Sequence, residues 1–199
     1  PSSNSPMLHA MLSNLPCEIT DAGIIADRLT DLETRLSALA STTDIIVTTG
    51  GASVGDHDLV QAALRNIGAD MDFWKVAMRP GKPVMAGKIG NTIVLGLPGN
   101  PSSAFVTAFL FLLPLIRHMA GSLSPLPEIL EATADNALFA GGSRTEYLRG
   151  RVEGGAITAF TSRDSGLVSP LSLSNALIIR DVDAPATPSG AVVQYHRLF

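Results

Sequence analysis

Hydrophobic and polar positions alternate between a helical period and short apolar runs along the first 120 residues. Leucine recurs through 29–39 at the spacing of an amphipathic helix. The run at 44–49 is short and continuously apolar after its first residue, as expected of a strand covered on both faces. Across this region the helical period predicts helices over 5–15, 27–40, 58–68 and 101–121. The short apolar runs predict strands over 17–24, 44–49, 73–78, 83–89 and 91–97.

Local signals mark the ends of several of these elements. Ser5, followed by a proline, is a suitable N-cap for the first helix. Gly68 and Gly121 stand where the helices over 58–68 and 101–121 should end. The pair at 90–91, Gly-Asn, predicts a hairpin turn between two strands.

Strands that alternate with helices predict an α/β fold, in which helices cover both faces of an open, mostly parallel sheet in three α/β/α layers. Such folds normally begin with a strand, whereas the first predicted element here is a helix. We therefore expect the first strand to be missing and the chain to be a fragment.

Beyond the linker-like segment SLSPLPE at 122–128, the pattern changes to short β-like runs separated by Gly, Ser, Asp and Pro. This tail predicts a small antiparallel sheet or β-barrel-like domain, with no substantial helix between 145 and 199. We expect two domains, an α/β domain over 1–123 and a β-domain over 127–199.

Composition narrows the class of protein. With a net charge of −4, the chain offers no basic face for nucleic acid or an anionic membrane. Cys17 is the only cysteine, which excludes an internal disulfide and fits a reducing, cytoplasmic compartment. The most apolar stretch, 104–116, is too short to span a bilayer and is interrupted by Pro114, so it predicts a buried core helix.

Candidate chemistry is concentrated in two glycine-rich elbows that each follow an apolar strand. In the first, Gly50 and Gly51 allow a ligand to approach the main chain, and Ser53 adds a hydroxyl. In the second, Asn100 is placed as an N-cap and Pro101 as the first helical residue, which would leave the next two N–H groups facing outward. Loops after parallel strands meet at one edge of the sheet, so together the elbows predict a phosphate site.

Each charged residue near the elbows could have either a structural role or a role in binding a ligand. Asp56 and Asp58 could cap a helix, but beside a phosphate they would need a divalent cation such as Mg²⁺. Asp27 could simply be the N-cap of the helix from Arg28. A basic cluster in WKVAMRPGKP could be ordinary solvated charge, or could bind an anion on a loop stiffened by proline; it comprises Lys75, Arg79 and Lys82.

Three segments in series resemble signatures of the molybdopterin molybdenumtransferase family, the MoeA-type enzymes to which the C-terminal part of gephyrin also belongs. They are TTGGASVGDHD at 48–58, FWKVAMRPGKP at 73–83 and LPGNPSSAF at 97–105. The first signature is matched at Thr49, Gly50, Gly51, Ser53, Gly55, Asp56 and Asp58. Segments at 144–152 and 164–179 resemble the family's C-terminal β-domain, so the likeness covers essentially the whole chain.

The resemblance implies a step in molybdenum cofactor biosynthesis, in which molybdate is inserted into adenylylated molybdopterin and AMP is released. It implies a homodimer, catalytic roles for Asp27 and Asp58, and Mg²⁺ held by Asp58. The substrates, adenylylated molybdopterin and molybdate, would be bound by Gly50, Gly51, Ser53, Gly55, Asp56, Lys75, Arg79, Pro80, Gly81, Lys82, Pro98, Gly99, Asn100, Pro101 and Ser102.

Two alternatives share parts of this pattern. The adenylyltransferases of the same pathway resemble TGGTG-x-x-x-RD at the first elbow, where this chain has TGGASVGDHD. A gephyrin-like scaffold would not bind AMP through the elbows and would expose an apolar groove. Since the family's first strand and two further N-terminal domains are not matched, we expect this chain alone to bind the substrate weakly without turning it over.

Overall fold

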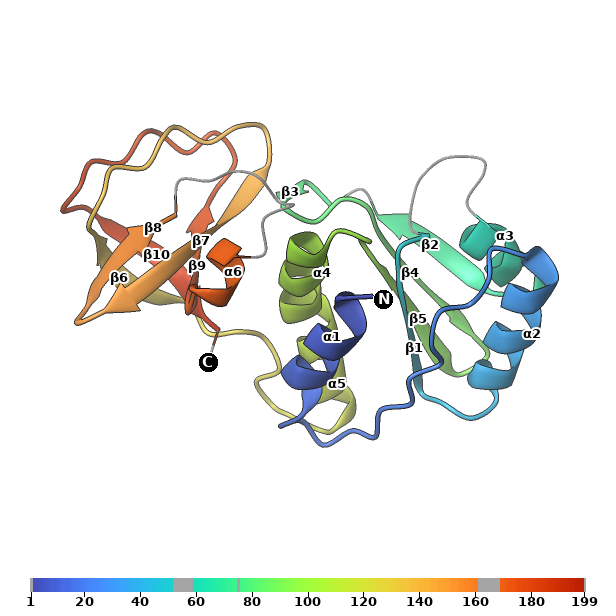
Figure 1. Ribbon diagram of the computed structural model, residues 1–199. Helices are drawn as coiled ribbons and strands as arrows, with labels where there is room; N and C mark the ends of the chain where they lie inside the picture. The colour runs from blue at the N-terminus through green and yellow to red at the C-terminus, as the bar shows by residue number, and fades with distance from the viewer. Residues whose placement is uncertain (1, 52–58, 75, 161–168, 199) are drawn as a thin grey trace. The chain divides into compact units, whose positions relative to one another are not determined.

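The computed structural model describes residues 2–51, 59–74, 76–160 and 169–198 (Figure 1). The chain divides into two compact units. The α/β unit comprises Pro1–Val76 and Gly81–Ala108, and the β-rich unit comprises Ala77–Pro80 and Phe109–Phe199. The change from the first unit to the second thus falls inside a helix, and the domain borders expected at 123 and 127 stay a prediction.

The α/β unit is built on a four-stranded sheet with strand order β1-β5-β4-β2. Its strands are β1 (Ile45–Thr49), β2 (Asp70–Trp74), β4 (Val84–Ile89) and β5 (Thr92–Leu97). Its helices are α1 (Asn4–Leu12), α2 (Leu29–Ala40), α3 (Leu59–Asn66) and α4 (Pro101–Thr107). Helices α2 and α3 cover one face of the sheet and α1 and α4 the other, which gives the three α/β/α layers that the sequence predicts (Figure 1).

One strand of this sheet runs in the opposite direction to the others. Strands β1 and β5 are parallel, but β4 is antiparallel to both β5 and β2. The hairpin turn at 90–91 forms as predicted, with Gly90 at φ +57°, and a two-residue turn can join only antiparallel strands. Strands β1, β5 and β2 therefore run in one direction, as expected of a mostly parallel sheet, and the hairpin makes β4 the exception.

The segment 17–24, expected to be a strand, forms no strand. Its first four residues are exposed, and it is held near α1 by side-chain contacts of Asp21 instead of a β-ladder. Asp21 accepts hydrogen bonds from the Ser5 hydroxyl and, at 2.8 Å, from the Gly23 N–H. Ser5 therefore does not cap α1 as expected; the N-cap residue is Ser3, which makes no side-chain capping bond.

The core of the α/β unit lies between the sheet and the helices α2 and α3. Its buried side chains are Leu32, Leu36, Ile46, Ala63, Leu64, Met85, Val94. The start of β5 is tied to the end of α2 by the Thr92 hydroxyl, which donates to the carbonyls of Ala40 and Thr43 at 2.8 and 2.7 Å. Gly68, at φ +83°, follows the end of α3 as predicted.

Helix α4 continues through a π-helical stretch, η1 (Ala108–Leu112), into α5 (Leu113–Met119). Pro114 explains the π-helical turn, because proline lacks an N–H and its ring clashes with the carbonyl four residues earlier. This continuous helix, Pro101–Met119, is long and apolar enough to cross a membrane by length and composition alone. A buried core helix passes the same test, and most of this one is buried, which matches the predicted core helix.

The β-rich unit contains a six-stranded sheet with order β3-β7-β8-β6-β10-β9. The strands are β3 (Met78–Arg79), β6 (Leu130–Ala134), β7 (Thr145–Glu153), β8 (Ala156–Ala159), β9 (Ala176–Arg180) and β10 (Val192–Arg197). Because β9 also pairs with β7, five of them close into a ring, as expected of a barrel-like domain. Beyond residue 145, the one helix in the described ranges is the four-residue α6 (Ser169–Ser172).

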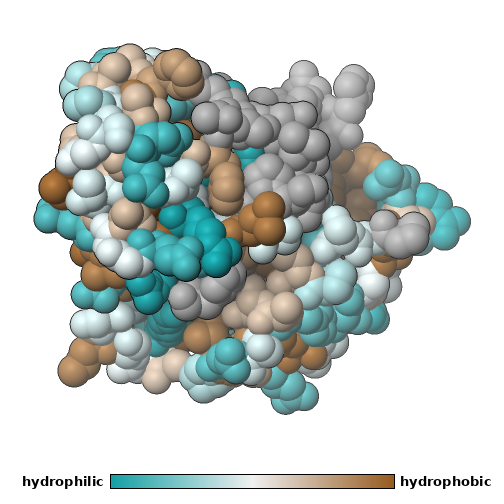
Figure 2. Space-filling model, turned by 60° about the vertical axis from the view of Figure 1, so that its left-hand side comes forward, coloured by the Kyte–Doolittle hydropathy of each residue, from teal (hydrophilic) through white to brown (hydrophobic). Residues whose placement is uncertain are grey.

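Strand β3 corrects a second sequence expectation. The range 73–78 was predicted as one strand, but β2 ends at Trp74 and β3, which begins at Met78, pairs in parallel with β7 of the other sheet. The core of the β-rich unit is formed by Ala132, Ala134, Leu138, Val152, Ile157, Ala159, Ala176, Ile178, Val193 and Tyr195. On the face of the molecule in Figure 2, hydrophobic residues are scattered among hydrophilic ones.

Candidate ligand-binding site

The two glycine-rich elbows lie side by side at one edge of the α/β sheet. Strands β1 and β5 run parallel, with Thr49 opposite Leu97, so the loops that follow these two strands begin side by side at the same edge of the sheet. The N–H of Gly50 donates to the carbonyl of Leu97 at 3.0 Å and extends the ladder into the first elbow. This confirms the prediction that the two elbows meet at one edge.

Glycine suits the backbone of the elbows where they touch. Gly50 and Gly51 have φ values of +85° and +68°, which side chains disfavour. A Cβ atom on Gly99 would lie 3.4 Å from the Cα atom of Gly50 and 3.8 Å from its nitrogen. The main chains of the two elbows therefore come together directly, and Gly99 is exposed while the preceding Pro98 is buried.

The second elbow forms the cap of α4 as the sequence predicts. Asn100 is the N-cap residue, with Pro101 next to it at the start of the helix. Its side-chain oxygen accepts a hydrogen bond from the Ser103 N–H at 3.2 Å, and its carbonyl accepts from Ala104 at 2.8 Å. The expectation that the N–H groups of both serines face outward was wrong for Ser103, because an N-cap side chain binds that third N–H of the helix. Ser102 is fully buried.

A residue that the sequence analysis did not select completes this edge. Asn4, in the first turn of α1, donates from Nδ2 to the carbonyl of Gly99 at 2.9 Å. The residue is 5% exposed, and its Oδ1 atom is buried without a hydrogen-bond partner in the part of the chain that the structure describes. The sequence signal was weak, because a single Asn among serines at the start of a helix is typical of a cap.

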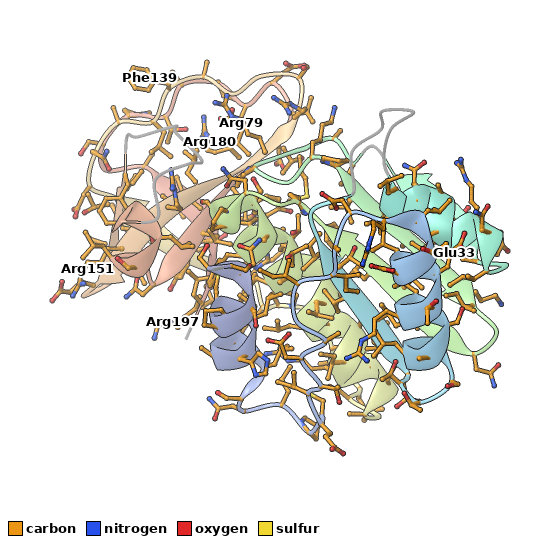
Figure 3. The ribbon with its side chains drawn as sticks, turned by 45° about the vertical axis from the view of Figure 1, so that its right-hand side comes forward. Glu33, Arg79, Phe139, Arg151, Arg180 and Arg197 are labelled. Carbon is orange, nitrogen blue, oxygen red and sulfur yellow. The ribbon has the colours of Figure 1, made fainter. Side chains whose placement is uncertain are left out.

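The predicted basic cluster is divided between the two units. Arg79 belongs to β3 of the β-rich unit, where its Nη1 lies 3.6 Å from the Glu146 carboxylate (Figure 3). Pro80 follows it in the same unit, whereas Gly81, buried at φ +139°, and the exposed Lys82 belong to the α/β unit. Lys75 lies outside the described residues. The cluster as an anion site stays a prediction.

The acidic candidates are placed only in part. Asp27 is exposed, and it does not cap α2; the N-cap is Arg28, whose guanidinium pairs with Asp31 at 2.6 Å. The helix begins two residues after Asp27, so the capping alternative was wrong for that residue. Ser53, Gly55, Asp56 and Asp58 lie outside the described residues, and in the described ranges no three His, Cys, Asp or Glu side chains form a metal-sized group.

Asp21 in the α/β unit and Tyr147 in the β-rich unit have shifted pKa values. Hydrogen bonds from the Ser5 hydroxyl and then from the Gly23 N–H hold the pKa of Asp21 below its usual value. Burial, and to a lesser degree the charge of Asp181, raises the pKa of Tyr147. Neither group is among the predicted ligand-binding residues, so these shifts concern stability rather than the elbows.

Comparison with known families agrees with the geometry of the elbows. Residues 1–118 match the family described as "Probable molybdopterin binding domain", and residues 131–198 match the "MoeA C-terminal region (domain IV)". The first match covers more than half of the chain and includes both elbows. The chain belongs to this molybdopterin-binding family. The second match covers most of the β-rich unit beyond α5.

Curated relatives of this family are named molybdopterin molybdenumtransferase. One from Haemophilus influenzae is 38% identical over 141 residues, which are 70% of this chain and 35% of the relative. One from a Nostoc species is 32% identical over 197 residues, which are 94% of this chain and 45% of the relative. The chain thus spans about a third to a half of the length of these relatives.

Two solved structures from Pyrococcus species share this fold. The molybdopterin biosynthesis MoeA protein of Pyrococcus horikoshii covers 100% of this chain with a TM-score of 0.83 at 22% identity, and the match spans 48% of that protein. A molybdenum cofactor biosynthesis protein from Pyrococcus furiosus covers 98% with a TM-score of 0.79 at 20% identity, over 64% of its own length. At these identities the likeness establishes the MoeA-like fold of both units.

Proposed function

We propose that this chain supplies the ligand-binding elbows of a molybdopterin molybdenumtransferase. The reaction inserts molybdate into adenylylated molybdopterin and releases AMP. The observation that carries the proposal is the direct approach of Gly50 to Gly99, which brings two main-chain elbows together at the carboxyl ends of parallel strands in a molybdopterin-binding fold. The family and the names of the relatives support the reaction.

The elbows suit the phosphate groups of such a substrate. Phosphate is bound well by main-chain N–H groups at positions where no side chain blocks the approach. Gly51 and Gly99 provide such positions, and Asn100 and Pro101 fix the direction in which the chain leaves the second elbow. Lys82 is exposed and available for attraction of an anion.

The metal and the assembly belong to the same proposal. We propose that Asp58 holds Mg²⁺, which would neutralise charge on the phosphoanhydride, and that Asp27, exposed before α2, assists there. The described residues do not include Asp58 and so do not test the fit of the metal. A homodimer and a cytoplasmic location follow from the resemblance to the family and from the single cysteine.

A titration with AMP tests the elbows. Gly50→Ala introduces a Cβ at φ +85° and 3.9 Å from the Cα of Gly99, and we expect it to weaken AMP binding by at least about tenfold, equal to about 1.4 kcal/mol. Gly68→Ala is the matched control, because Gly68 has φ +83° but no atom within 4 Å of the added Cβ. Equal AMP affinity in wild type and Gly50→Ala, or no binding by wild type, would remove the elbows from the site.

Asp58→Ala tests the metal. In a protein that carries this sequence and inserts molybdate, we expect the change to reduce AMP release about a hundredfold or more, because the counter-charge for cleavage is lost. Loss of a helix cap would instead cost about 0.5–2 kcal/mol of stability and leave turnover intact. Wild-type turnover of Asp58→Ala would assign Asp58 to capping.

A further inference from the structure

Asn4 is a buried polar residue whose side-chain amide makes a hydrogen bond through its NH₂ group but not through its oxygen. Its Nδ2 donates to the Gly99 carbonyl at 2.9 Å, but its Oδ1 has no partner in the described part of the chain and is inaccessible to solvent. An unpaired buried acceptor costs free energy, and such groups in native proteins call for a specific explanation. The position of Asn4, against the glycine elbow, suggests one.

The orientation of the Asn4 amide follows from its partner. A carbonyl oxygen only accepts hydrogen bonds, so the atom that faces the Gly99 carbonyl must be the NH₂ group. A flipped amide would place two acceptor oxygens 2.9 Å apart and leave the donor unpaired. The contact therefore requires a donor at this position, which an aspartate of the same shape cannot supply when ionised.

The contact also fixes the peptide group that follows. The bond between Gly99 and Asn100 is trans, so the Gly99 carbonyl and the Asn100 N–H point in opposite directions from one rigid plane. With the carbonyl held by Asn4, the Asn100 N–H must point away from α1. Within the described ranges, that N–H donates to no protein group, whereas the side chain and carbonyl of Asn100 are both engaged in the cap of α4.

We propose that Asn4 is a positioning residue of the ligand site, which orients the Gly99–Asn100 peptide so that the Asn100 N–H is presented to a phosphate group of the bound substrate. The assignment rests on the proposed function for the identity of the ligand. It adds α1 to the two elbows as a third element of the site and gives a role to a residue that contacts no reacting atom.

Two asparagines of the β-rich unit show what a purely structural amide does. Asn136 uses both groups of its side chain on Ala159, with distances of 3.1 and 2.8 Å. Asn175 does the same with Val152, at 3.0 and 2.7 Å. In both cases the side-chain amide binds the N–H and the carbonyl of one residue, as a neighbouring strand would, so its nitrogen and its oxygen both have partners. The Asn4 side chain makes one hydrogen bond in the described part of the chain and leaves its acceptor oxygen buried without a partner, which packing alone does not favour.

The test compares Asn4→Asp with Asn136→Asp in the 199-residue chain. Each variant removes one amide-to-carbonyl hydrogen bond without changing the size of the side chain, so both should lower the melting temperature. For Asn4→Asp we expect a large shift of the Asn100 backbone amide resonance and a loss of AMP affinity of about ten- to a hundredfold, as for loss of one charge-assisted hydrogen bond. For Asn136→Asp we expect neither.

A measurement on the wild-type chain keeps the proposal testable if Asn4→Asp does not fold. A scalar coupling across the hydrogen bond should join Asn4 Nδ2 to the carbonyl carbon of Gly99, and AMP should shift the Asn100 amide resonance. Absence of that coupling, or a folded Asn4→Asp with the wild-type Asn100 resonance and AMP affinity, would overturn the role. If wild type binds no AMP while Asn4→Asp moves the Asn100 resonance, Asn4 orients the peptide and the proposed ligand is wrong.

Discussion

In the β-rich unit, the amides of Asn136 and Asn175 each bind a neighbouring backbone through both of their groups, whereas at the elbows of the α/β unit the Asn100 N–H binds no protein group of the described residues. Arg180 is 6% exposed and donates from its two terminal nitrogens to the Thr187 hydroxyl and to the carbonyls of Phe139 and Pro185, while its Nε is buried without a partner among the described residues. Figure 3 labels Arg180 and Phe139, whose backbone carbonyl accepts one of these hydrogen bonds. By contrast, the elbows meet at Gly50 and Gly99, and the Asn4 side chain makes a single hydrogen bond there, to the Gly99 carbonyl.

The charged residues of the β-rich unit also follow the strand register. Arg79 lies opposite Glu146, and Glu146 lies opposite Arg180, so three strands carry alternating charges in one row. A buried charge is tolerated when its neighbours compensate it. These polar groups of the β-rich unit therefore bind groups of the same unit and stabilise it. The edge of the α/β sheet where the elbows meet is better suited to bind a ligand.

The largest expected change in the free energy of unfolding comes from substitutions in the two hydrophobic cores, one in each unit. Ile178→Ala in the β-rich unit and Leu64→Ala in the α/β unit each empty a fully buried position. We expect each to lower the free energy of unfolding of its own unit by about 2–5 kcal/mol. Chemical denaturation, followed by amide exchange in each unit, measures this. Equal loss of protection in both units for both variants would show that they unfold as one and would break the comparison.

The role of buried charge is tested at Arg180. Arg180→Ala should destabilise the β-rich unit by about 1.5–3 kcal/mol, because it removes charged donors from two loop carbonyls and a hydroxyl. Arg151→Ala is the control, since Arg151 is exposed and, among the described residues, pairs with Glu153 at 3.5 Å. Denaturant midpoints of the two variants that agree within error would contradict the assignment.

The smallest effect concerns the segment held near α1. The folded state lowers the pKa of Asp21 from 3.8, chiefly through the Ser5 hydroxyl. The unfolded chain then binds more protons at this site, so the stabilisation is present above the unfolded pKa and is lost as the pH falls through the folded one. Asp21→Asn should flatten the decrease of stability below about pH 4. An unchanged pH profile would mean that Asp21 leaves the stability of the α/β unit unaffected.

Local chemistry made several features predictable. Asn100 at the N-cap, glycine after α3 and α5, and the Gly90 turn were read correctly because each depends on the backbone preference of one or two residues. The shared edge of the elbows was predictable from the rule that loops after parallel strands meet. The prediction of Ser5 as an N-cap was wrong, because the Ser5 hydroxyl donates its hydrogen bond to Asp21 instead. Such local signals fail where a residue distant in sequence competes for the same group.

The sequence by itself determined the layers, the two glycine elbows and the change to a β-rich tail, because periodicity and turn residues act over a few positions. Only the tertiary structure decided that β3 joins the second sheet, that β7 and β9 close the ring, and that Asn4 binds Gly99. These contacts join residues 26 to 95 positions apart (Gly150 to Ala176, and Asn4 to Gly99). Their formation depends on how whole elements pack, which no short window of sequence records.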